Sequence, residues 1–107
     1  MDDSIQEVLN LLVYIYLQNE KFDKALSLLQ AMKKIAPNDQ AVNRSLAYTH
    51  LQKGNFQEAL LSAEQSMRDP NLPEGLKIAS TLIKSKALMG LGREEAARHA
   101  IQQLIKL

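Results

Sequence analysis

Cysteine is absent from this chain of 107 residues. Disulfide bonds, thiolate metal sites and cysteine-based catalysis are therefore excluded, and the absence fits a reducing compartment such as the cytosol. Proline and glycine are scarce, with three and four copies respectively. Interruptions of regular secondary structure are accordingly few, and their positions are informative.

Charge of one sign is not in excess either. Thirteen basic and twelve acidic residues give a formal charge of +1, and they alternate along the chain instead of forming a basic tract. No nucleic-acid partner is therefore expected. The length fits one domain, which buries roughly two thirds of its unfolded surface on folding.

A hydrophobic run long enough to span a membrane is missing. The longest apolar stretch, Val8–Leu17, is followed by the polar residues Gln18 to Glu20, whereas a membrane-spanning helix needs about 20 apolar residues. The sequence also begins with the acidic MDDS, where a signal peptide would be basic. We therefore expect a cytoplasmic protein with no membrane insertion. Because Val8–Leu17 is apolar nearly all round, we expect it to pack on its own chain with one face and to offer another to a partner.

The spacing of apolar residues predicts six helices and no strand. The first helix is expected from about Ser4 to Gln18, and the second ends before Pro37, which disfavours helical geometry in the preceding residue. Gly54 ends the third helix in a left-handed conformation, and the fourth follows it. Turn residues at 69–73 precede the fifth helix, and the sixth begins near Arg93.

Two stretches of the sequence repeat at an interval of 34 residues. KFDKALSLL begins at Lys21 and NFQEALLSA begins at Asn55, so that their phenylalanine, alanine and leucine residues coincide. A fixed period of this length that covers two helices is typical of a helical-hairpin solenoid.

The chain resembles the tetratricopeptide repeat family. The first repeat matches the family pattern at Leu9, Leu12, Tyr16, Phe22, Ala25, Leu29 and Pro37. The second matches it at Leu46, Ala47, Gly54, Phe56, Ala59 and Ala63. The third is degenerate, because Gly92 and Ala97 fit only after about four inserted residues near Asp69 to Pro73. In the first repeat Glu20 stands where the family has glycine, and Asn19 is expected to take the left-handed conformation instead.

This resemblance implies an all-α fold of three tandem hairpins that form a short right-handed solenoid with a concave groove. It implies a single domain over residues 1–107, with repeats at about 4–37, 39–69 and 73–107. It also implies which residues line the groove. In the first repeat they are Glu7, Asn10, Tyr14, Leu17 and Gln18; in the second, Ala41, Arg44, Tyr48, Leu51 and Gln52; in the third, Leu82, Lys86 and Met89.

Tyrosine, leucine and methionine in such a groove suit an amphipathic helix or an extended peptide. The alternative is that these residues pack against each other in a closed core. Members of the family that hold the C-terminal carboxylate of heat-shock proteins use lysines and asparagines there. Asn10, Arg44 and Lys86 match that set poorly, so this ligand is not expected.

Catalytic and metal-binding constellations are not apparent in the sequence. His50 and His99 lie far apart, without further ligands at helical spacing. Glu94 and Glu95 fit the first turn of a helix, where the helix dipole favours acidic residues. No phosphate-binding glycine loop or nucleophile motif is present. We therefore expect a protein that is not an enzyme and has no cofactor.

The closing segment Ala97–Leu107, together with Leu28, Leu29 and Pro37, is similar to the small tetratricopeptide chaperones of bacterial type III secretion. This resemblance implies a bacterial cytoplasmic chaperone that holds a needle or export-gate component soluble and releases it for transport. The alternative is a tetratricopeptide adaptor in an unrelated complex. Leu11 and Ile15 fall neither in the repeat core nor in the groove, so they are a candidate second interface with a co-chaperone or with a copy of the chain.

Overall fold

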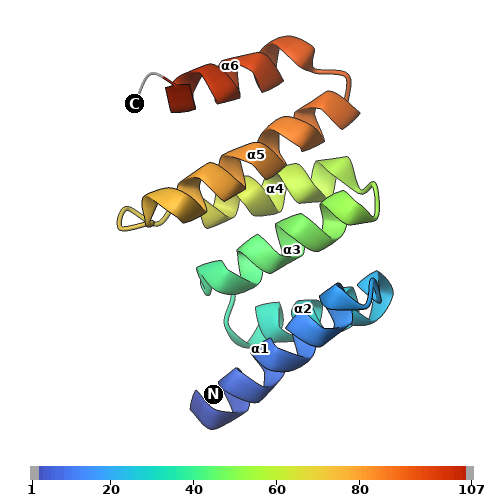
Figure 1. Cartoon of the computed structure of the whole chain (residues 1–107). Helices are drawn as coiled ribbons and strands as arrows, with labels where there is room; N and C mark the ends of the chain where they lie inside the picture. The colour runs from blue at the N-terminus through green and yellow to red at the C-terminus, as the bar shows by residue number, and fades with distance from the viewer. Residues whose placement is uncertain (1–2, 106–107) are drawn as a thin grey trace.

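A computed structural model of the chain describes residues 3–105, which form six helices and no strand. Figure 1 shows the helices stacked as three hairpins, α1 with α2, α3 with α4, and α5 with α6. The predicted all-α architecture of helical hairpins is confirmed. The bounds are α1 Asp3–Gln18, α2 Phe22–Ile35, α3 Gln40–Gln52, α4 Phe56–Ser66, α5 Glu74–Gly90 and α6 Glu94–Ile105.

The helices pack mainly on their neighbours in chain order, as a solenoid requires. The first helices of the second and third hairpins, α3 and α5, also contact each other. In contrast, α1 packs on α2 and has little contact with α3. The first hairpin is therefore open on the side where α1 faces α3.

The same turn joins the two helices of every hairpin. Glu20, Gly54 and Gly92 occupy it with φ angles of +56°, +78° and +77°. In each case the next residue donates its amide to a carbonyl five residues earlier: Lys21 to Tyr16, Asn55 to His50 and Arg93 to Leu88, at 2.8 to 2.9 Å. This is the Schellman arrangement, which satisfies carbonyls left free at a helix end.

The predicted left-handed residue of the first turn was Asn19, and that prediction is wrong. Glu20 takes the left-handed conformation, although it is not glycine. The side-chain amide of Asn19 instead donates to the Ile15 carbonyl oxygen at 2.8 Å. Asn19 is therefore held at the end of α1, and the left-handed residue falls one position later, as in the other two turns.

Two clusters of buried side chains form the core. The first joins three helices through large side chains: Val13 of α1, Leu29 and Met32 of α2, and Val42 and Leu46 of α3. The second is rich in alanine and joins α4, α5 and α6 through Ala59, Leu60, Ala87, Leu88 and Ala97. Small residues let these later helices approach closely, which is what the alanines of the repeat pattern predict.

Val13 is the buried residue of α1, with 5% of its surface exposed. The sequence pattern had placed Leu9, Leu12 and Tyr16 in the core. Leu9 does pack against the first cluster, but Leu12 and Tyr16 line a shallow hollow beside α2 and are only half-buried. Within residues 3–105, none of the helices combines the length and the apolar character that crossing a membrane demands.

Candidate protein-binding site

Large apolar side chains are exposed mainly on the first helix of each hairpin. Of thirteen such residues in the described part of the chain, ten lie on α1, α3 and α5 and only three on α2, α4 and α6. Scattered exposed apolar residues are ordinary, but a concentration on one set of helices marks an interaction surface. We call the surface formed by α1, α3 and α5 the A-helix face.

The predicted groove residues of the first repeat come together where α1 faces α3. Asn10, Tyr14 and Leu17 of α1 line a hollow of about 260 Å³ with Ala41 and Ser45 of α3. The base of this hollow is formed by core residues of the first cluster. Tyr14 is 60% exposed, so its ring is available to a partner, whereas Leu17 also packs against the core.

The predicted groove residues of the second repeat differ in exposure. Tyr48 is 40% exposed and Arg44 is half-buried. Leu51 packs against the second core cluster and is only partly accessible. On α3, Tyr48 is therefore the main apolar group offered to a partner.

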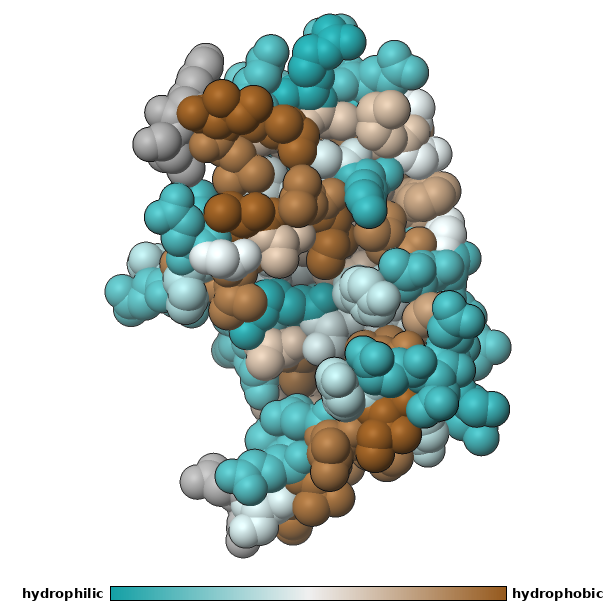
Figure 2. Space-filling model, viewed as in Figure 1, coloured by the Kyte–Doolittle hydropathy of each residue, from teal (hydrophilic) through white to brown (hydrophobic). Residues whose placement is uncertain are grey.

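In the third hairpin, all three predicted residues of α5 lie at the surface. Leu82 and Met89 are 45% and 53% exposed, and Lys86 is exposed beside them. Met89 also borders a hollow of about 440 Å³ between α5 and α6, where Ala97 and Ile101 add apolar surface. Figure 2 shows hydrophobic side chains gathered over α1 and over α5 and α6, with more hydrophilic residues between them.

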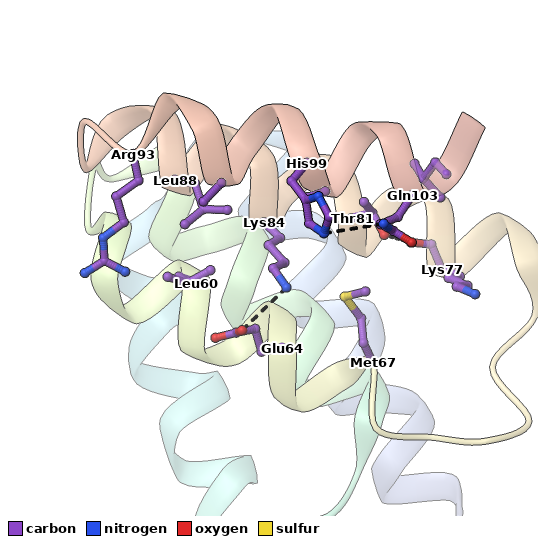
Figure 3. Close-up of a pocket in the computed structure, with 13 residues that line it drawn as sticks. Leu60, Glu64, Met67, Lys77, Thr81, Lys84, Leu88, Arg93, His99 and Gln103 are labelled. Atoms are coloured by element: carbon purple, nitrogen blue, oxygen red, sulfur yellow. Dashed lines mark hydrogen bonds and ion pairs between the residues drawn. The ribbon is translucent and has the colours of Figure 1, made fainter. Parts of the chain in front are cut away.

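A second hollow was missed by the sequence reasoning. It has a volume of about 610 Å³ and lies where α4, α5 and α6 meet. Figure 3 shows the Lys84 ammonium beside the Glu64 carboxylate on its wall, 3.5 Å apart. Lys77 and Arg93 also border it, and Leu60 and Leu88 form part of its apolar base. These residues come from three helices with no regular spacing, so no sequence pattern announces the hollow.

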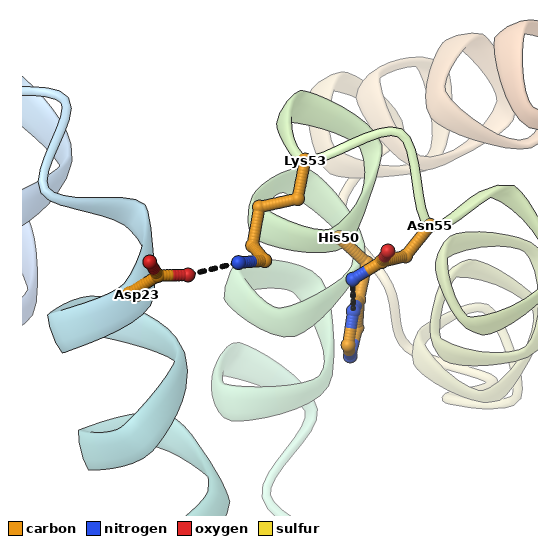
Figure 4. Close-up of polar contacts among 4 residues, drawn as sticks. All are labelled: Asp23, His50, Lys53 and Asn55. Atoms are coloured by element: carbon orange, nitrogen blue, oxygen red, sulfur yellow. Dashed lines mark hydrogen bonds and ion pairs between the residues drawn. The ribbon is translucent and has the colours of Figure 1, made fainter.

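Polar contacts at the end of α3 link the first two hairpins. Lys53 forms an ion pair with Asp23 of α2 (Figure 4). Because the Asp23 side chain is 87% exposed, we expect this pair to add little stability. In the same region the Asn55 side-chain amide lies 3.2 Å from Nδ1 of His50, which suits a neutral imidazole that accepts a hydrogen bond.

Burial lowers the pKa of His50 below its usual value near 6.5, and the nearby Lys53 lowers it further while Glu58 opposes the shift. Since the folded pKa lies below the unfolded one, the contribution of His50 is complete above pH 6.5 and declines as the pH falls from there toward the folded pKa. We expect acidification from pH 8 to 5 to lower the melting temperature of the wild type more than that of His50→Gln. Parallel melting curves for the two proteins would contradict this account.

The tetratricopeptide repeat family model matches residues 16–70. This range is just over half of the chain, from the end of α1 through α4 to the loop before α5. The chain belongs to the tetratricopeptide repeat family. No curated protein matches it.

Membership of the tetratricopeptide repeat family suggests a protein-interaction module, because stacked hairpins create extended concave surfaces that bind other chains. The match ends at residue 70, so residues 73–107 as a degenerate third repeat stay a prediction. Residues 3–105 of this tetratricopeptide repeat protein hold no group of three His, Asp or Glu side chains that could bind a metal ion.

Proposed function

We propose that the A-helix face of this tetratricopeptide repeat protein binds an amphipathic helix of a partner protein. The observation that carries the proposal is the set of exposed apolar side chains that α1, α3 and α5 each contribute: Tyr14, Tyr48, Leu82 and Met89. An amphipathic helix laid in a groove buries such residues. Tyrosine supplies large contact area from a stiff side chain, and methionine adapts to irregular partners.

Polar groups beside these residues indicate which partner helix would fit. Arg44 and Lys86 supply two positive charges next to Tyr48 and Leu82, and Asn10 supplies an amide beside Tyr14. A helix with acidic residues along the flanks of its apolar stripe would complement this arrangement. We therefore infer an apolar stripe bordered by Asp or Glu in the partner.

The finer proposal is a bacterial cytoplasmic chaperone for a type III secretion component, such as the needle subunit. It is supported by the similarity of Ala97–Leu107 to the small chaperones of that pathway and by the apolar surface that needs a partner. In this role the protein would keep an amphipathic segment soluble and release it for export. The alternative is an adaptor that assembles an unrelated complex through the same face.

Co-expression with the type III needle subunit of the same bacterium tests the proposal. We expect a 1:1 complex by size-exclusion chromatography with light scattering. Tyr48→Ala should weaken the affinity about tenfold, because exposed aromatic residues at interfaces commonly contribute more than about 1 kcal/mol. The matched control is Leu61→Ala on α4, which removes a side chain that is 57% exposed on the opposite set of helices.

Each outcome of this experiment separates the readings. Binding that is weakened by Tyr48→Ala and unchanged by Leu61→Ala supports the A-helix face. Equal effects of both substitutions would remove that face from consideration. Loss of helicity in Tyr48→Ala, measured by circular dichroism, would make Tyr48 a core residue. A stable monomer that ignores the needle subunit would contradict the secretion role.

A further inference from the structure

The outer face of α1 carries an apolar stripe that neither the core nor the groove uses. Ile5, Val8, Leu11 and Ile15 are exposed by 54%, 64%, 58% and 44%. Leu12 lies beside them and is half-buried. Tyr14, which lines the groove, lies on a different side of the helix, about 120° away at 100° per residue. A continuous apolar stripe this exposed usually marks an interface.

Charge indicates that the stripe meets protein rather than a membrane. Helices that lie on membranes place Lys and Arg along their polar face to meet anionic lipid. No Lys or Arg occurs between Asp3 and Gln18, and the next basic residue is Lys21 in the turn. A membrane surface is therefore a poor occupant for this face.

The spacing of the stripe indicates what the protein partner is. Ile5, Val8, Leu12 and Ile15 follow one another at intervals of three, four and three residues, the pattern of a coiled-coil seam. This pattern reads the same in both directions about position 10. Reversing a second copy of α1 therefore places Ile5 opposite Ile15 and Val8 opposite Leu12, and a symmetric dimer requires this kind of self-complementarity.

We propose that two copies of the chain form a dimer through antiparallel α1 helices, with Ile5, Val8, Leu12 and Ile15 at the seam and Leu11 beside it. The two-fold axis places the Glu7 residues of the two copies on opposite flanks, so like charges do not meet. With its polar rim, such a pair buries on the order of 1,000 Å², the lower end for a specific interface. We therefore expect reversible dimerisation at micromolar concentrations. Tyr14 and the groove stay open.

Because the chain has no cysteine, disulfide cross-linking tests the arrangement directly. We expect an equal mixture of Ile5→Cys and Ile15→Cys proteins to form a disulfide-linked dimer on mild oxidation. Neither protein alone should do so, because residues 5 and 5 of antiparallel helices are about 15 Å apart along the axis, beyond disulfide reach. A mixture of Leu61→Cys with Ile15→Cys is the control for random collisions and should stay monomeric.

Sedimentation of the cysteine-free protein provides the second measurement. Val8→Glu should weaken dimerisation at least tenfold while helicity stays unchanged, since Val8 is largely exposed. Leu61→Glu and Tyr14→Ala should leave the dimer intact. Cross-links within Ile5→Cys alone would indicate parallel helices, and a wild-type monomer up to about millimolar concentration would also overturn the proposal. Either result leaves the proposed groove function untouched, because that function is measured through Tyr48.

Discussion

Leu29→Ala is expected to lower the free energy of unfolding by about 2–5 kcal/mol, the range for truncating a buried leucine. Leu29 is 1% exposed and lies in the first core cluster. It packs there with Val13 of α1 and Val42 of α3, so the cavity would separate the first hairpin from the second. Domains of this size have a total stability of about 5–15 kcal/mol. Urea unfolding followed by circular dichroism measures the loss.

The control is Leu61→Ala, the same change on a leucine that is 57% exposed. Its effect should stay within about 0.5 kcal/mol, as for most surface substitutions. Solenoids are held together by contacts between neighbouring repeats. If Leu29→Ala frees the first hairpin to unfold separately, the dependence of stability on urea concentration should become shallower. A loss below about 1 kcal/mol would show that the site collapses around the missing atoms.

The positions of the helices could be predicted from the sequence because local signals specify them. Pro37 and Gly54 each lie in an observed break between helices. The 34-residue interval added a non-local constraint, since it required two helices per repeat and hence hairpins. These signals act over a few residues or through a fixed period, so they survive without knowledge of the packing.

The orientation of α1 could not be predicted in the same way. A helix that is apolar nearly all round has no polar face to point away from the core. The family pattern therefore placed Leu12 and Tyr16 inside, whereas Val13 is the residue that α1 buries. Its sparse contact with α3 leaves the remaining apolar sides of α1 for the groove and for the outer stripe.

The groove could be predicted only as far as the repeat geometry holds. Tyr48 and Leu82 occur where the pattern places exposed groove residues, but Leu51 also serves the second core cluster. The hollow between α4, α5 and α6 depends on how far the helices are separated in space. Such separations arise from side-chain volumes across three helices, which no single-helix periodicity records.

Gly90→Ala is expected to destabilise the protein, although alanine normally stabilises a helix relative to glycine by up to about 1 kcal/mol. Gly90 is the last residue of α5. A Cβ atom there would lie 2.5 Å from the Phe56 ring, closer than atoms can approach. Phe56 begins α4 and packs against the second core cluster, so the ring must move out of its packed position. Overpacking of this kind costs about 1–3 kcal/mol.

Gly75→Ala is the matched control in the same helix, because a Cβ at Gly75 meets nothing within 4 Å. It should leave stability unchanged or raise it slightly. In a Phe56→Ala background the clash is removed, so Gly90→Ala should then become neutral or stabilising. This reversal of sign in a double-mutant cycle would assign the cost to the contact between Gly90 and Phe56. An equal penalty with and without the ring would show that glycine is needed at position 90 for its backbone alone.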